Sequence, residues 1–150
     1  MADFRFRLAT LLRLREAARD ERRAQLAEAY QAEEIIKKRL TALDDDIAQL
    51  RDRYKHAAEP GSVNVDSLLE SQRFEAIVKA EKQVIAGQVE LLAKEIEKRR
   101  DALIAADREV RVLEKLRETG QERHQQLELA KEAKMLDEVA GRTSTREVIF

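Results

Sequence analysis

The chain of 150 residues has no cysteine, no tryptophan, one proline and four glycines, and its net charge is only −1. Without cysteine, disulfides, thiolate nucleophiles and zinc sites with cysteine ligands are excluded. Aromatic residues amount to 4%, so the bulky side chains that fill a thick globular core are scarce. So few prolines and glycines also argue against a sheet of many strands, because such a sheet needs many turns.

Charged and apolar residues dominate instead. Charged residues make up 39% and hydrophobic residues 43%, and the apolar share is too high for a disordered chain. Many charges, many apolar residues and few helix breakers are typical of long helices and coiled coils. The longest apolar run, residues 102–106, is too short to cross a membrane. The first residues do not resemble a secretory signal, so the sequence predicts a cytoplasmic protein without membrane insertion.

A single loop divides the chain. Pro60 disfavours helix at the residue before it, and Gly61 permits a positive φ. We expect one helix at about residues 6–58, a loop at 59–66, a second helix at about 67–140 and a flexible tail at 141–150. Ser67 and Glu70 have the spacing of a capping box at the start of the second helix, with Asp66 as an alternative cap.

Each predicted helix carries one apolar line with the alternating spacing of three and four residues that marks a coiled-coil seam. In the first helix the line is Ile36, Leu40, Leu43, Ile47, Leu50, Tyr54 and Ala57. In the second helix it is Val89, Leu92, Ile96, Arg99, Leu103, Ala106, Val110 and Leu113, of which only Arg99 is charged. The first line is poor between Arg15 and Glu33, where alanines supply a thin apolar surface and loose packing is expected.

Two such lines joined by a short loop predict that the helices bury each other. The fold class is therefore all-α: a long antiparallel two-helix coiled-coil hairpin, a single domain over residues 1–150, with both termini at one end. Folding at the loop brings residue 6 beside a position near 119. Residues after Gly120 would then extend past the start of the first helix.

The sequence contains no motif that indicates catalysis or metal binding. It has no glycine-rich phosphate loop, and the hairpin keeps His56 and His124 apart. The abundant carboxylates are interpreted as solvated helix faces with ion pairs between neighbouring turns. We therefore predict no enzyme, no catalytic residue, no cofactor and no metal.

Two surfaces are candidates for partners. The first 23 residues hold seven arginines and four acids, which suits an acidic protein surface, nucleic acid or simply solvent. Near the loop, a "loop-end patch" of apolar residues either plugs the end of the hairpin or binds a partner. Its members are Ile47, Leu50, Tyr54, Phe74 and Val78.

Four segments of the chain resemble one family. They are Phe4-Arg5-Phe6-Arg7-Leu8, Leu11-Leu12-Arg13-Leu14-Arg15-Glu16, Val112-Leu113-Glu114-Lys115-Leu116-Arg117-Glu118 and Lys134-Met135-Leu136-Asp137-Glu138-Val139-Ala140. In order, spacing and total length they are similar to the FliJ proteins of the bacterial flagellar export apparatus. The resemblance covers nearly the whole chain.

The resemblance implies a non-enzymatic stalk that binds the hexameric flagellar export ATPase, promotes its activity and links it to the cytoplasmic domain of the export gate. It also implies contact with export chaperones, an association with flagellum biogenesis and chemotaxis, and a cytoplasmic location at the inner membrane of the flagellar base. The residues expected to contact the ATPase form the "terminal surface": Phe4, Phe6, Leu8, Arg13, Arg15, Glu16, Arg19, Glu114, Lys115, Asp137 and Glu138.

The loop-end patch is the corresponding candidate for the gate, although Glu81 stands where an apolar residue would suit the family better. A stalk of this kind is expected to be a monomer when free and not to bind nucleic acid. The alternatives are a homodimeric coiled-coil scaffold or tether, and a coiled coil that binds nucleic acid.

Overall fold

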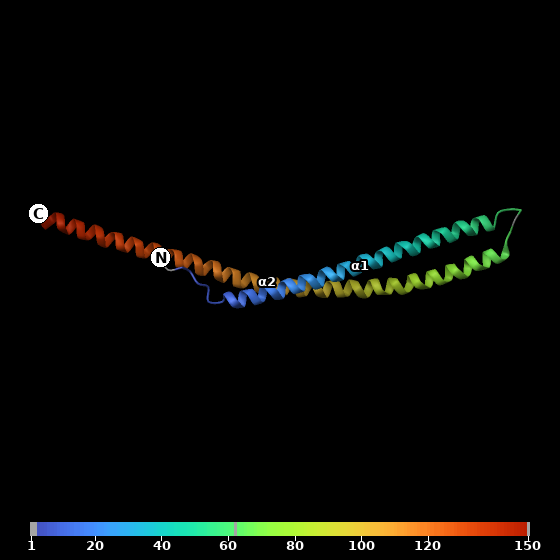
Figure 1. Ribbon diagram of the computed structural model, residues 1–150, viewed down its shortest axis with the longest axis horizontal. Coiled ribbons are helices and arrows are strands. Elements are labelled where there is room, and N and C mark those ends of the chain that lie inside the picture. The colour runs from blue at the N-terminus through green and yellow to red at the C-terminus, as the bar shows by residue number, and fades with distance from the viewer. Residues whose placement is uncertain (1–2, 62, 150) are drawn as a thin grey trace. The chain divides into compact units, whose positions relative to one another are not determined.

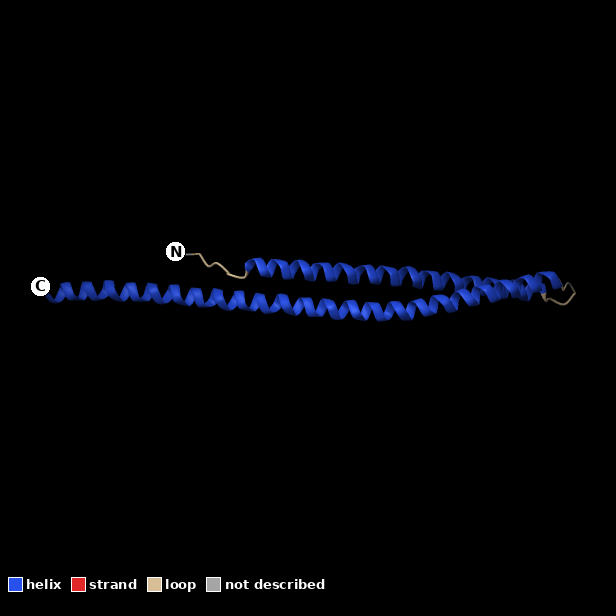
Figure 2. Cartoon of the chain, turned by 90° about the horizontal axis from the view of Figure 1, so that it is seen from below, coloured by secondary structure: helices blue, strands red, loops and turns tan. Residues whose placement is uncertain are grey.

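The computed structural model describes residues 3–61 and 63–149, with side chains described through residue 145. It contains two helices, α1 (Ala9–Ala57) and α2 (Val65–Ile149), and no strand among the described residues. The described parts that are not helical are the N-terminal segment and the loop, drawn in tan in Figure 2. The predicted all-α hairpin of two long helices that pack against each other is confirmed.

The start of α2 differs from the prediction. The side-chain oxygen of Asn64 accepts a hydrogen bond from the Ser67 N–H at 3.3 Å, and its carbonyl accepts one from the Leu68 N–H at 3.1 Å. Asn64 is therefore the N-cap, and the predicted cap at Ser67 or Asp66 is wrong. The loop turns at Gly61, whose φ of 108° is open to glycine but strained for other residues.

The other helix ends also differ. Helix α1 begins at Ala9, three residues after the predicted start, because the Ala9 N–H closes a turn onto the Phe6 carbonyl at 3.2 Å. Helix α2 continues to Ile149 instead of ending near residue 140. Gly141 alone weakens a helix by only about 1 kcal/mol. The hydroxyls of Thr143 and Thr145 each donate to the carbonyl four residues earlier, so these polar groups are satisfied within the helix.

The described chain divides into two units, each made of a part of α1 and a part of α2. The "loop unit" is Glu21–Ile104, and the "terminal unit" is Met1–Asp20 with Ala105–Phe150. The predicted single domain stays a prediction, and each unit is described by itself.

In the loop unit, α1 (blue to green in Figure 1) and α2 (green to yellow) lie side by side and are joined by the loop. The core consists of Leu43, Ile47, Leu50, Val78 and Ile85, with Ile36, Leu40 and Val89 packed around it. Ion pairs join Arg39 to Glu81, Asp44 to Lys82 and Arg51 to Glu75. From the Arg39–Glu81 pair to the Arg51–Glu75 pair, residue numbers rise along α1 and fall along α2, so the packing is antiparallel.

The terminal unit has a smaller core. Leu12, Val110 and Leu113 are buried there, and Phe6 and Leu8 of the N-terminal segment pack against them. Arg15 pairs across the helices with Glu109 at 2.9 Å. Past the N-terminal segment, α2 continues without a second helix beside it, as both views show at the end marked C (Figures 1 and 2). Residues 129–145 are all exposed.

The predicted seams largely match the burial. All eight seam positions of α2 are buried or half-buried, whereas in α1 Tyr54 is exposed. Arg99 is accommodated because its guanidinium donates from Nη1 to the Gln25 carbonyl at 2.6 Å and from Nε to Glu95 at 3.0 Å. Within the alanine-rich stretch of the loop unit, Ala29 is buried and Arg22 is exposed, so a small residue occupies the interface there.

Candidate partner-binding surfaces

The described residues offer no metal centre, since no group of three or more histidine and carboxylate side chains gathers among them in a way that could hold an ion. The two histidines belong to different units. His56, in the loop unit, places its Nδ1 atom 3.4 Å from a carboxylate oxygen of Glu59, which lies in the loop just after α1. His124, in the terminal unit, stacks at an angle against Phe4.

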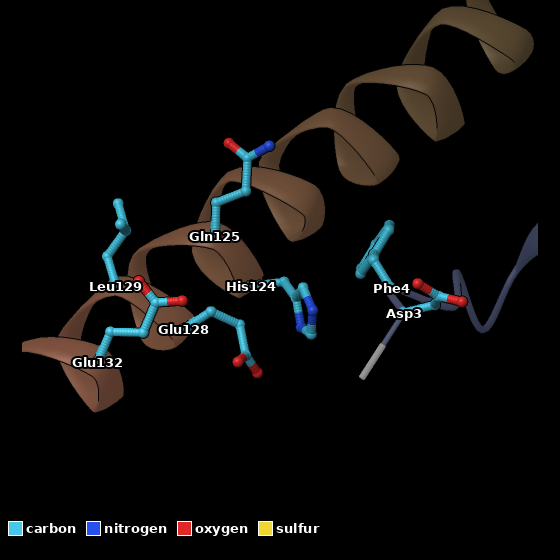
Figure 3. Close-up of a pocket in the computed structure, with 7 residues that line it drawn as sticks. All are labelled: Asp3, Phe4, His124, Gln125, Glu128, Leu129 and Glu132. Atoms are coloured by element: carbon cyan, nitrogen blue, oxygen red, sulfur yellow. The ribbon is translucent and has the colours of Figure 1, made fainter. Parts of the chain in front are cut away.

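The apolar members of the terminal surface are part of the fold. Phe6 and Leu8 pack on the core of the terminal unit. The ring of Phe4 rests on α2 at Gly120, where a Cβ atom would lie only 3.1 Å from its Cζ atom. Figure 3 shows His124 pointing from α2 toward Phe4, and the centroids of the two rings are 5.8 Å apart. The N-terminal segment is thus held on α2 by aromatic contacts that a Cβ atom at position 120 would crowd.

A cleft of about 470 Å³ opens beside this contact. Asp3 and Phe4 line it from the N-terminal segment, and side chains of α2 complete it (Figure 3). These are His124, Gln125, Glu128, Leu129 and Glu132. Three of the seven residues that line the cleft are acidic, so its rim suits cationic rather than anionic groups.

The arginines of the terminal surface differ in availability. Arg13 is exposed. Arg15 is about half exposed and pairs with Glu109. The Arg19 side chain is 22% exposed, and its Nε lies 3.4 Å from Asp20. Glu16 between them is half-buried. Arg13 and Arg15 therefore present most of the accessible positive charge of this set.

On α2 the terminal surface is mostly acidic. Glu114 is half-buried, and Lys115 is exposed at 3.9 Å from Glu118. Asp137 and Glu138 are exposed on the part of α2 that has no neighbouring helix. The sequence prediction missed the exposed apolar residues of this part: Leu127, Leu129, Met135, Leu136 and Val139. Their helical spacing was a usable signal, since the hairpin prediction already left this segment without a neighbouring helix.

The loop-end patch separates into two groups. Ile47, Leu50 and Val78 are buried in the core of the loop unit, where they hold the helices together. Tyr54 is 43% exposed and Phe74 is 55% exposed. Two shallow hollows of about 230 and 210 Å³ share Leu50, Arg53 and Phe74 in their linings. Only the two aromatic members are therefore accessible to a partner.

Two arginines of the loop unit are held by specific hydrogen bonds. The carboxylate of Glu81 accepts a hydrogen bond from Arg39, and this bond raises the pKa of the Arg39 guanidinium. Arg100 donates from Nη2 to the Tyr30 hydroxyl at 2.7 Å, which also raises its pKa. Both hydrogen bonds link α1 to α2.

In the described residues, neither helix has a stretch long and apolar enough to span a bilayer.

Comparison with protein families finds that the model of the flagellar FliJ protein matches residues 4–148, which is nearly the whole chain. The match includes both units and the loop between the helices. Comparison with curated proteins finds no match, and comparison with solved structures finds none either.

Proposed function

Because this chain belongs to the family of flagellar FliJ proteins, and so to the flagellar protein export apparatus, we propose that it acts there as a non-enzymatic stalk. It binds the hexameric export ATPase through its terminal unit, promotes ATP hydrolysis, and contacts the cytoplasmic domain of the export gate through its loop unit. It does so on the cytoplasmic side of the inner membrane at the flagellar base. Contact with export chaperones belongs to the same proposal.

The stalk supplies differential contacts and does no chemistry. A single asymmetric chain inside a six-fold ring meets six subunits in different ways, so it binds some ring states better than others. A ligand with unequal affinity for two states shifts their populations by that difference. Contact with the stalk therefore favours the closed, hydrolysing arrangement of the ring.

The single observation that carries the ATPase contact is the distribution of charge on the terminal unit. Arg13 and Arg15 lie near the start of α1, and Asp137 and Glu138 lie on the part of α2 without a neighbour. The apolar residues Phe6 and Leu8 are used in the core. Binding to the ring therefore depends on exposed charges, which tolerate the mismatch between one stalk and six subunits better than close apolar packing does.

The gate contact rests on Tyr54 and Phe74, the accessible members of the loop-end patch. Aromatic side chains are enriched at protein interfaces because they bury a large area at little entropic cost. Leu50 and Arg53 line the same two hollows as Phe74, so the surface beside the Phe74 ring is partly apolar.

The ATPase contact is tested by replacing Arg13, Arg15 and Arg19 together with glutamine and measuring ATP hydrolysis by the export ATPase with the purified chain added. Because the three cations contribute mainly to encounter and docking, we expect at least a tenfold loss of stimulation at physiological salt. Circular dichroism should report an unchanged helix content. Stimulation that is unchanged at low salt, where ionic contacts are strongest, contradicts the proposal.

The matched control removes three cations from the loop unit. Lys37, Lys38 and Arg39 are paired with Glu33, Glu34 and Glu81 respectively, and their replacement by glutamine changes the net charge equally. This variant should stimulate the ATPase like the unmodified chain. Sedimentation of the free chain separates the stalk from a homodimeric scaffold, because a stalk that enters a ring is expected to be a monomer.

A further inference from the structure

Two neighbouring arginines of α2 reach across to α1 within the loop unit. We call Arg99 and Arg100 the arginine pair. Arg99 donates from Nη1 to the Gln25 carbonyl at 2.6 Å, and Arg100 donates from Nη2 to the Tyr30 hydroxyl at 2.7 Å. A further bond, from Nε of Arg99 to Glu95, stays within α2. The first two bonds therefore depend on the position of α1 along α2, whereas the third does not.

The apolar seams do not fix that position, because both of them repeat every seven residues. The repeat is Val78, Ile85 and Leu92 in α2, and Ile36, Leu43 and Leu50 in α1. If one helix slid along the other by seven residues, about 10 Å, apolar side chains would again face apolar side chains. Arg99 occupies the next position of the α2 repeat and interrupts it.

The loop and the packing near the arginine pair also leave the position open. The seven residues between the helices, 58–64, span up to about 23 Å when extended. Helix axes pack about 8–10 Å apart, so a slip of about 10 Å would need a span of only about 15 Å. The buried residue of α1 at this level is the small Ala29, and a hollow of about 390 Å³ opens beside Arg99.

A slip in one direction would bring the arginine pair against cations. If residues seven positions earlier in α1 faced the pair, Arg22 would stand in place of Ala29 and Arg23 in place of Tyr30. An arginine side chain has no hydrogen-bond acceptor, and like charges repel each other. This register would therefore leave Arg100 without the acceptor that it has in the structure.

A slip in the other direction would suit the pair no better. Ile36 would stand in place of Ala29, and Lys37 would stand in place of Tyr30. The larger Ile36 side chain would obstruct the path of Arg99 to a backbone carbonyl, and Lys37 is another cation. Glu33, an acid at this level, is already paired with Lys37 at 3.0 Å. Of the three registers, only the observed one gives both arginines an acceptor without a facing cation.

We propose that the arginine pair fixes the register of the hairpin, so that α1 and α2 pair at one relative position out of several that their apolar seams would allow. A polar residue at a single seam position can specify register in a coiled coil at some expense of stability. Any surface that both helices share is then presented in one arrangement, because a slip would change which residues stand side by side. The proposal concerns the hairpin itself and does not depend on the ATPase or gate contacts.

The test measures the distance between one label on each helix. Because the chain has no cysteine, Gln31→Cys and Gln72→Cys supply its only thiols, at exposed and uncharged positions of α1 and α2 in the loop unit. Spin labels at these two sites should give one narrow distance peak by double electron–electron resonance. Arg99→Leu with Arg100→Gln should add a second peak, displaced by about 7–10 Å for a slip of seven residues. A single peak at the original distance in this variant overturns the proposal.

A matched control removes two other arginines that pair across the helices. Arg39 and Arg51 pair with Glu81 and Glu75, and their side chains are 53% and 67% exposed. Arg39→Leu with Arg51→Gln changes the net charge equally and should keep one peak. An equal second peak in this control overturns the proposal, because any cross-helix pair would then serve.

Circular dichroism separates sliding from unfolding. The variant of the arginine pair should keep the helix content of the unmodified chain, since leucine completes the apolar seam of α2. A broad distance distribution together with lost helix content also overturns the proposal, because the arginines would then hold the fold and not its register.

Discussion

Two glycines inside α2 form a matched pair that tests how the N-terminal segment is held. Gly87 and Gly120 both lie in the interior of the helix, so alanine should improve helix propensity equally, by about 1 kcal/mol. At Gly87 a new Cβ atom meets nothing within 4 Å. At Gly120 it would lie 3.1 Å from Cζ and 3.4 Å from Cε2 of Phe4. The two substitutions therefore differ in one contact.

The magnitude follows from that contact. Gly87→Ala should stabilise the chain by about 1 kcal/mol, a rise in melting temperature of about 2–4 °C for a protein of this size. At Gly120 the Phe4 ring must move by a few tenths of an ångström and loosen its contact with His124. Crowding of a packed side chain typically costs about 1–3 kcal/mol, so the gain in propensity should be cancelled or reversed. Urea and thermal unfolding followed by circular dichroism measure both variants.

The double variant Phe4→Ala with Gly120→Ala supplies the control. Without the ring, the alanine at position 120 should stabilise the chain relative to Phe4→Ala alone by the same amount as Gly87→Ala stabilises the unmodified chain. If Gly120→Ala stabilises the chain as much as Gly87→Ala while Phe4 is present, Phe4 does not rest on α2 as described.

Further predictions concern the core, the cap and an ion pair. Leu43→Ala should lower the free energy of unfolding by about 2–5 kcal/mol in urea titrations, because Leu43 is 1% exposed at the centre of its cluster. Asn64→Ala should cost about 0.5–2 kcal/mol and Ser67→Ala much less, since only Asn64 caps α2. The exposed pair of Arg15 and Glu109 should contribute at most about 1 kcal/mol in a double-mutant cycle, and the coupling should vanish at high salt.

The seams were predictable because a helix of 3.6 residues per turn leaves few choices for an apolar line with alternating spacing of three and four. The spacing along α2 assigns Ile96, Val110 and Leu113 to the helix interface, and all three are buried. Tyr54 fits the same spacing in α1 but is 43% exposed. Periodicity gives the face on which a residue lies, but not whether the partner helix reaches far enough to cover it.

The helix ends were harder to predict because several local signals compete there. Asn64, Asp66 and Ser67 are all good cap residues, and the choice among them depends on loop geometry that the sequence does not display. The C-terminal end was placed too early because Gly141 and the threonines weaken a helix without stopping it. In the structure the Thr143 hydroxyl donates a hydrogen bond to the Val139 carbonyl, one turn earlier in the same helix.

The candidate sites were predicted as sets, and the structure sorts each set into core and surface. Phe6 and Leu8 of the terminal surface pack in a core, as do Ile47, Leu50 and Val78 of the loop-end patch. Sequence motifs do not separate the two roles, because an apolar residue near a helix end suits packing and binding equally. The contact of Phe4 with α2 at Gly120 could not be predicted from the sequence either, because the two residues are more than a hundred positions apart.

A hairpin of two helices buries one face of each helix, so every other apolar side chain must lie on the outside. Leu43 and Val110 are the largest side chains that are almost fully buried, whereas Ile77, Val84 and Leu91 are mostly exposed on one line of α2. Folding does not require these exposed residues, and water does not favour them. Substitutions on the outside should therefore change binding with little loss of stability, whereas substitutions in the seam should change both. That separation allows the partner contacts of each unit to be measured without unfolding the chain.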